Sequence, residues 1–172
     1  LTTSPPTLRA TLLDVHQAPY GSTATPDGSR LAHYQHKDKV VLVFDVTPNG
    51  VTERTRIPTT GECGVSLSQD GRRLVLSPQR SALYELWDLS TNPPSVVKFG
   101  ANDKYSSFTV FSPNGQRLVT GTAPYQDHFG PVPFRLWDIS DALPKELWSK
   151  PLTLPGMKHG NQLPSGAITP DG

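Results

Sequence analysis

The sequence predicts an all-β protein built from repeated units of four short strands. Its length of 172 residues corresponds to about one domain. Proline accounts for 18 residues and glycine for 14, and proline interrupts almost every window in which a helical apolar period could develop. A turn motif recurs four times along the chain. Short strands joined by tight turns are therefore the expected architecture.

The recurring motif is Ser/Thr-x-Asp/Asn-Gly. It begins at Thr25, Ser68, Ser112 and Thr169, and its glycines are separated by 43, 44 and 57 residues. The Ser or Thr hydroxyl can bond back to the main chain, and glycine adopts the positive φ that other residues resist. We expect a tight turn at each copy, in which Gly28, Gly71 and Gly115 are structural residues.

Two strands are expected after each of the first three turns. The dipeptide Arg-Leu stands two residues after the glycine in all three copies, beginning at Arg30, Arg73 and Arg117. Short apolar runs follow at 40–43, 83–86 and 134–136. Each run leads into an aromatic residue and an aspartate, at Phe44-Asp45, Trp87-Asp88 and Trp137-Asp138. Runs of this length, rich in β-branched and aromatic residues, are typical of strands.

Two further strands complete each unit. Inner strands are expected at 21–25 and 64–68, where small residues lead into the turns and suit strands crowded around the axis of the repeat. Outer strands are expected at 8–15, 51–57, 96–99 and 147–154. The aromatic residues Phe44, Trp87 and Trp137 are each preceded by an apolar residue that points to the other face of the strand. Both faces are therefore covered, as in sheets that stack face to face.

These repeats resemble WD40 repeats. Residues 112–121 read Ser-Pro-Asn-Gly-Gln-Arg-Leu-Val-Thr-Gly, residues 135–140 read Arg-Leu-Trp-Asp-Ile-Ser, and residues 85–90 read Glu-Leu-Trp-Asp-Leu-Ser. Recurrence at about 40 to 45 residues is typical of this family. The resemblance implies WD40-like β-propeller blades over residues 1–172, about three complete four-stranded blades plus a partial one. The units are roughly 7–47, 51–90, 95–140 and a partial unit at 145–172.

The sequence also departs from the family pattern. The Gly-His dipeptide expected near the start of each repeat is absent, so the hydrogen-bonded Asp, His, Ser/Thr and Trp tetrad is incomplete in every copy. Only Thr120 and Trp137 match two of its members. Propellers usually have about 4 to 8 blades, so we expect the open blade edge to be covered by further sequence or by another copy of the chain.

A long insertion distinguishes the third unit. Residues 123–133 extend a hairpin loop, and repeat proteins commonly place binding residues in such loops. Tyr125, Asp127, His128 and Phe129 combine aromatic and polar groups as interface patches do, and they form the expected partner-binding loop. The alternative is a solvated insertion stiffened by its three prolines.

Sequence patterns for catalysis, cofactors or metals are not found. His33 and His36 point to opposite faces of an extended strand, so a solvent-exposed hairpin tip is expected here rather than a metal-binding site. Cys63 is expected to be a small buried thiol. Arginine pairs such as Arg54 with Arg56 are expected to lie at strand edges, where their charge discourages unwanted strand pairing. The sequence also contains no Gly-x-Ser-x-Gly elbow and no phosphate-binding glycine loop.

The expected function is that of a non-catalytic scaffold that mediates protein–protein interaction or sensing, as part of a larger propeller or multidomain protein. A net charge of +1 gives no reason to expect nucleic acid or a membrane surface as partner. No signal peptide is recognised, so a cytoplasmic location is expected. The alternatives are a propeller accessory to a TolB-like or prolyl-oligopeptidase-like hydrolase, and a subunit that self-assembles through its unclosed blade edge.

Overall fold

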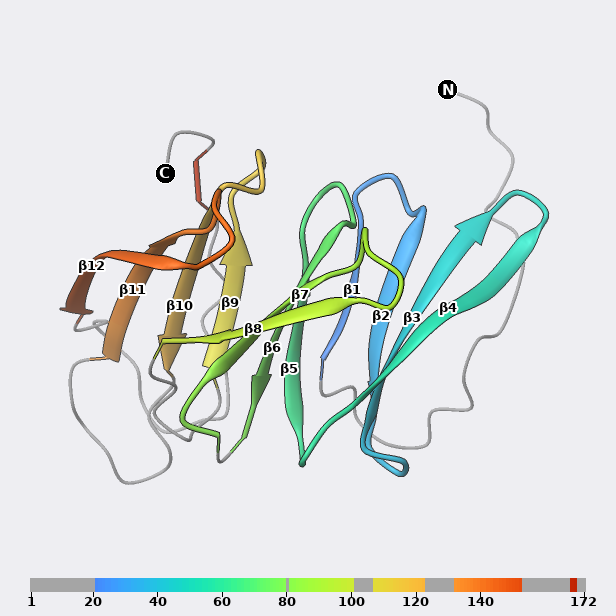
Figure 1. The fold of residues 1–172 in the computed structure, drawn as a ribbon, viewed down its shortest axis with the longest axis horizontal. Coiled ribbons are helices and arrows are strands. Elements are labelled where there is room, and N and C mark those ends of the chain that lie inside the picture. Colours follow the sequence, from blue (N-terminus) through green and yellow to red (C-terminus); the bar gives the residue numbers. More distant parts are fainter. Residues whose placement is uncertain (1–20, 80, 101–106, 123–131, 153–167, 170–172) are drawn as a thin grey trace, which may run out of the picture.

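The computed structural model describes residues 21–79, 81–100, 107–122, 132–152 and 168–169, whose strands form three four-stranded antiparallel sheets (Figure 1). Sheet 1 consists of β1 (Ser22–Ala24), β2 (Arg30–Gln35), β3 (Val40–Thr47) and β4 (Gly50–Pro58). Sheet 2 consists of β5 (Cys63–Leu67), β6 (Arg73–Pro78), β7 (Tyr84–Asp88) and β8 (Ser95–Phe99). Sheet 3 consists of β9 (Ser107–Phe111), β10 (Arg117–Thr122), β11 (Val132–Asp138) and β12 (Lys145–Leu152).

The all-β prediction is confirmed, since every regular element in the described ranges is a strand. No helix in these ranges has the length and apolar character that crossing a membrane requires. Strands follow chain order within each sheet. The predicted partial fourth blade falls mainly outside the described residues.

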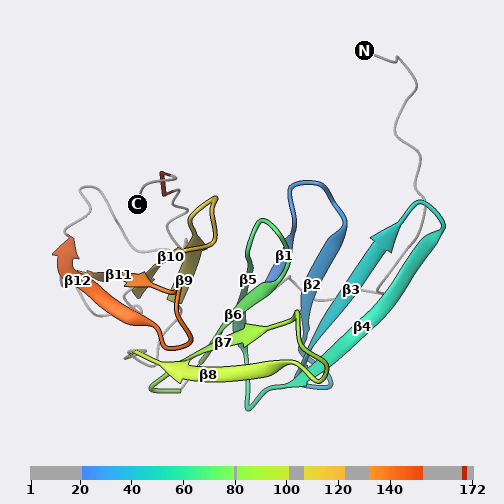
Figure 2. The same cartoon turned by 45° about the horizontal axis from the view of Figure 1, so that its top comes forward.

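The three sheets stand next to one another as blades, with β4 and β12 at opposite ends of the molecule (Figures 1 and 2). The first strand of sheet 2 contacts β1 and β2 on one side and β9 on the other. Sheet 2 is thus the middle blade, packed between the other two.

Two apolar clusters fill the spaces between successive blades. The first joins Ala32, Tyr34, Val41, Val43 and Ile57 of sheet 1 to Cys63, Leu67, Leu74, Leu76 and Leu89, with Val65 and Trp87 against it. The second joins Val75, Tyr84, Leu86 and Phe99 of sheet 2 to Phe111, Leu118, Trp137 and Ile139. Adjacent residues of one strand therefore serve different clusters, because successive side chains point to opposite faces.

Two of the three recurring aromatic residues lie between blades as predicted, whereas Phe44 is buried but belongs to neither cluster. Trp137 is 4% exposed and its ring packs edge-on against Phe99 at a centroid distance of 5.1 Å. Trp87 is half-buried and packs against the first cluster, while Phe44 is buried. The indole Nε1 of Trp137 donates to Thr120 Oγ1 at 3.0 Å in a buried hydrogen bond, so the two expected members of the tetrad do meet.

The predicted sequence units are offset from the sheets by one strand. Residues 51–57 were assigned to the second unit, but β4 pairs with β3 from Val40↔Pro58 to Thr47↔Gly50. The short turn after β3 folds the chain straight back onto that strand, and Thr47 Oγ1 donates to Gly50 O at 3.1 Å within it. β8 joins β7 in the same way.

Two smaller expectations need correction. Residues 36–39 form an exposed hairpin tip, but His33 is 7% exposed and its Nδ1 lies 2.8 Å from Ser22 Oγ. This burial follows from its place in the middle of β2, opposite Ser22 on β1. Arg54 does not lie only at a strand edge, because its Nη2 donates to Leu89 O in the next blade at 2.8 Å.

Candidate functional site

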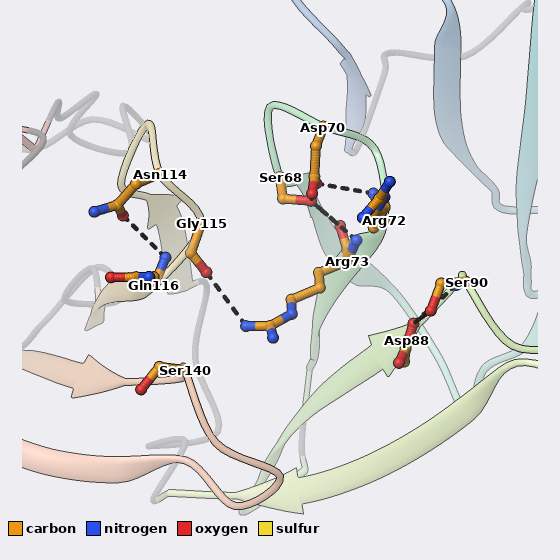
Figure 3. Close-up of a pocket in the computed structure, with 10 residues that line it drawn as sticks. All are labelled: Ser68, Asp70, Arg72, Arg73, Asp88, Ser90, Asn114, Gly115, Gln116 and Ser140. Atoms are coloured by element: carbon orange, nitrogen blue, oxygen red, sulfur yellow. Dashed lines mark hydrogen bonds between the residues drawn. The ribbon is translucent and has the colours of Figure 1, made fainter.

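A polar hollow of about 340 Å³ lies between sheets 2 and 3 (Figure 3). It is bounded by the turn after β5, the turn after β9, the end of β7 with the residues after it, and the residues that follow β11. Its lining residues are Ser68, Asp70, Arg72, Arg73, Asp88, Ser90, Asn114, Gly115, Gln116 and Ser140. The two turns are copies of the recurring motif, so the hollow is built directly from the sequence repeat.

Each turn holds its own polar groups in place. In sheet 2, Ser68 Oγ donates to Asp70 Oδ1 at 2.6 Å, and the same carboxylate oxygen accepts the Arg72 main-chain N–H at 3.0 Å. Ser68 Oγ also accepts the Arg73 N–H at 2.9 Å. Gly71 takes a φ of 67°, which glycine adopts without the steric cost of a side chain.

The turn of sheet 3 repeats this pattern. Ser112 Oγ donates to Asn114 Oδ1 at 2.7 Å, and that oxygen accepts the Gln116 N–H at 3.0 Å. Gly115 takes a φ of 69°. Side chains that follow each glycine, Arg72 and Gln116, are exposed beside the hollow. The predicted tight turns are confirmed here, and their fixed geometry leaves these two side chains available to a ligand.

Two aspartates supply negative charge at the hollow. Burial tends to raise the pKa of Asp70, but hydrogen bonds from Ser68 and the Arg72 main chain outweigh it and lower the pKa below its usual value. The pKa of Asp88 is lowered by the hydroxyl and main-chain N–H of Ser90, which donates to it through both groups. Both carboxylates are therefore ionised at neutral pH and act only as acceptors.

Arg73 connects the two blades at the hollow. Its Nη1 donates to Gly115 O at 3.3 Å and also to Ile139 O. An equivalent bond crosses from sheet 1 to sheet 2, where Arg30 Nη1 donates to Gly71 O at 2.6 Å. We call these bonds from the Arg-Leu position to the next turn the inter-blade arginine bonds. Those of Arg73 join the two walls of the hollow.

The hollow offers donors and acceptors of both charges, and its surface is mostly polar. The guanidinium of Arg72 and the amide of Gln116 donate, and the carboxylates of Asp70 and Asp88 accept. Within the described ranges, no group of three or more His, Cys, Asp or Glu side chains is placed to hold a metal ion. The arrangement is chemically suited to hydrogen bonding with a polar chain such as a peptide backbone.

The thiol of Cys63 does not contribute to the hollow. It is 2% exposed and belongs to the first apolar cluster. Burial raises its pKa to about 12, and the nearby Glu85 charge adds to the effect. Because the thiolate is the reactive form of cysteine, this residue is inert at neutral pH, in agreement with its predicted role in the core.

The expected partner-binding residues Tyr125, Asp127, His128 and Phe129 lie outside the described residues, so their role stays a prediction. The insertion that contains them follows the end of β10, whereas the hollow adjoins the start of that strand. Sequence reasoning did not identify the hollow. The available signal was the turn repeat itself, since equivalent turns of neighbouring blades are brought to the same end of the molecule.

Solved structures that resemble this chain share the propeller-like arrangement. Hydrazine synthase from Kuenenia stuttgartiensis matches with a TM-score of 0.59 and 20% identity over 78% of this chain and 37% of its own. A candidate 6-phosphogluconolactonase from Bacteroides fragilis matches with a TM-score of 0.56 and 16% identity, over 78% and 39%. The Cps50 (Swd1) β-propeller domain from Myceliophteria thermophila matches with a TM-score of 0.50 and 20% identity, over 74% and 38%.

The chain therefore has a β-propeller fold of blade-like four-stranded sheets. It spans about two fifths of the length of these structures. No family model matches the sequence, and no curated protein matches it significantly. At these identities the resemblance extends to the fold alone.

Proposed function

We propose that this chain is a WD40-like propeller segment that acts as a non-catalytic scaffold and binds a protein or peptide. The observation that carries the proposal is the polar hollow, whose two walls are preorganised copies of one turn. A rigid site lowers the ordering cost of binding. The exposed Arg72 and Gln116 at its rim supply donors that a peptide carbonyl or a carboxylate side chain would accept.

Two features support the WD40 assignment within the propeller class. Turn, Arg-Leu and aromatic-Asp elements recur at the family's period. The buried hydrogen bond from Trp137 to Thr120 reproduces half of the tetrad that the resemblance implies. On this proposal, the absence of the Gly-His dipeptide makes the chain a divergent member of that family.

The non-catalytic part of the proposal is supported by the state of the reactive groups. The pKa of the Cys63 thiol is raised to about 12 by burial, and the pKa values of the hollow's aspartates are lowered. A carboxylate that acts as a general base needs a pKa raised toward the working pH, whereas the pKa values of these two aspartates are lowered. The near-neutral net charge of +1 favours a protein partner over nucleic acid or a membrane surface.

The hollow can be tested with peptides selected for binding to the chain from a display library. We expect the double variant R72A/Q116A to weaken binding of the selected peptides by about tenfold or more, since losing hydrogen bonds to a charged group costs about 1.5 to 3 kcal/mol. Titration calorimetry measures the change. The matched control is S29A, because Ser29 follows Gly28 in the first turn as Arg72 follows Gly71 in the second. We expect S29A to leave the affinity for the selected peptides unchanged. Equal binding by R72A/Q116A would reject the hollow as the binding site.

The insertion is the second surface to test, because it carries the predicted residues Tyr125, His128 and Phe129. Replacing all three by alanine should abolish partner capture without changing the fold if this loop holds the binding anchors, since a few aromatic residues usually dominate an interface. Binding of the selected peptides and far-UV circular dichroism are the readouts. Retained binding would remove the insertion from the proposed function.

A further inference from the structure

We propose that Asp88 makes the hollow specific for a basic side chain, so that the peptide bound there is anchored by a lysine or an arginine. Asp88 is the last residue of β7 and lies half-buried in the wall of the hollow. This inference rests on the proposed function and deepens it, because it states which chemistry of the partner the same site selects.

The aspartate that follows the recurring aromatic residue is paired with an arginine in sheets 1 and 3. Asp45 lies 2.7 Å from Arg30 and 3.2 Å from Arg54. Asp138 lies 2.5 Å from Arg117. Arg30 and Arg117 are both the first residue of the recurring Arg-Leu dipeptide. The same two positions of the repeat therefore form an ion pair in both outer sheets.

Asp88 is the member of this series that lacks an arginine partner. Its Oδ1 accepts the main-chain N–H of Ser90 at 2.8 Å and the hydroxyl of Ser90 at 2.6 Å. Among the residues that the structure describes, no cation lies within ion-pair distance of this carboxylate, and its Oδ2 accepts no hydrogen bond. One oxygen of a half-buried anion is thus left for a ligand, and a donor that carries positive charge offsets its burial best.

The arginine of the same repeat position in sheet 2 is directed elsewhere. Arg73 donates through Nη1 to Gly115 O and to Ile139 O, both in sheet 3 or directly after it. Figure 3 shows its guanidinium reaching toward Gly115 and away from Asp88. The bonds that join the two walls of the hollow therefore leave the aspartate of one wall without a direct partner.

The outer strand of sheet 2 does not supply a substitute. In sheet 1, Arg54 is the extra residue of a bulge in β4, opposite the step from Val43 to Phe44. β8 pairs with β7 without such a bulge. The single cation of β8, Lys98, pairs with Glu85 at 3.2 Å. Both sources of positive charge that neutralise Asp45 in sheet 1 are therefore missing at Asp88.

The remaining lining of the hollow fits the peptide that carries the basic side chain. A lysine ammonium or an arginine guanidinium has donors only, which complements a carboxylate that only accepts. The exposed Arg72 and Gln116 remain free to donate to main-chain carbonyls, and Asp70 of the same turn balances the charge of Arg72. A metal ion is not favoured, because the described ranges contain no group of three His, Cys, Asp or Glu ligands.

The test uses peptides that are selected on the full chain from a random display library and whose binding is weakened by R72A/Q116A. We expect one position of these peptides to be lysine or arginine. Changing that residue to glutamine should weaken binding by about tenfold or more, and D88N should weaken binding of the original peptide similarly. The two changes together should cost little more than either alone, since both remove the same ion pair. Titration calorimetry gives all four affinities.

The matched control is D45N, because Asp45 holds the same repeat position in sheet 1 and does not line the hollow. We expect D45N to leave the affinity unchanged. The change in the peptide needs no protein variant, so the test stands even if D88N fails to fold. Selected peptides without a basic position, or full additivity of D88N and the glutamine change, would overturn the inference and leave the proposed function intact. Binding that R72A/Q116A does not weaken would instead reject the hollow itself, and the inference with it.

Discussion

Individual residues such as Trp137 make several kinds of stabilising contact at once. Trp137 fills the space between blades 2 and 3, stacks edge-on against Phe99, and donates its only N–H to Thr120. Trp87 occupies the same place in the preceding blade, but it is half-buried and donates to Glu85 Oε2 at 3.1 Å. Equivalent tryptophans of the two Trp-Asp pairs therefore differ in how much stability they supply.

The Trp137–Thr120 hydrogen bond can be isolated by substitution. Trp137→Ala should lower the free energy of unfolding by about 3 to 5 kcal/mol, and Trp87→Ala by less. T120V alone should cost about 1 to 3 kcal/mol, because the buried indole N–H loses its partner. W137F/T120V should cost less than the sum of W137F and T120V measured singly, since both polar groups are then removed. Urea denaturation measures all five variants, and strict additivity of W137F and T120V would contradict a coupled pair.

Ionised aspartates after the aromatic position make stability depend on pH. Hydrogen bonds from the Ser140 hydroxyl and main chain, with Arg117, lower the pKa of Asp138 from 3.8 to about 2. Its folded-state pKa lies below the unfolded value, so its contribution is present above pH 3.8 and is lost as pH falls toward 2. We expect D138N and, in part, S140A to flatten the fall in melting midpoint across this window. An unchanged slope in D138N would refute the assignment.

At the scale of elements, the connections between blades are polar as well as apolar. Arg30 forms an ion pair with Asp45 at 2.7 Å and donates onward to Gly71, so one side chain links a strand, its neighbour and the next blade. Arg54 also pairs with Asp45, at 3.2 Å, and reaches Leu89. The sequence repeat predicted that Arg30, Arg73 and Arg117 share a position. It did not predict the partners of Arg30 or the role of Arg54, because a repeat within the sequence does not say which neighbouring backbone lies within reach.

The inter-blade arginine bonds can be tested at two adjacent residues. R73A should lower the free energy of unfolding by about 1 to 3 kcal/mol, because it removes charged hydrogen bonds to two carbonyls of sheet 3. R72A, the neighbouring and exposed change, should stay within about 0.5 kcal/mol of the parent, as surface substitutions usually do. Chemical denaturation of both variants gives the comparison. Equal losses in the two would indicate a general charge effect instead of a bond between blades.

At the scale of the whole molecule, the sequence was sufficient for the type of fold and the turns. Four-stranded sheets followed from the turn repeat and the alternating apolar residues, and the turns at Gly28, Gly71 and Gly115 have the expected positive φ. The assignment of 51–57 to the wrong sheet shows where this reasoning stops. Residue pattern identifies a strand, but the length of the Thr47–Gly50 connection decides which neighbour it pairs with. The hollow was missed for a related reason, since its walls come from two repeats.

The stacked arrangement predicts an uneven distribution of stability. Each blade contacts only its neighbours, so local stability should follow the number of packed faces, as in other repeat proteins. Sheet 2 is packed on both faces, and Leu74, Val75 and Leu76 of β6 have no exposed surface. Native-state hydrogen exchange should therefore show the slowest amide exchange in β6 and faster exchange in β12, whose Trp148 is exposed. Uniform protection across the three sheets would mean that they unfold as a single unit, and protection greatest in β12 would contradict the central position of sheet 2.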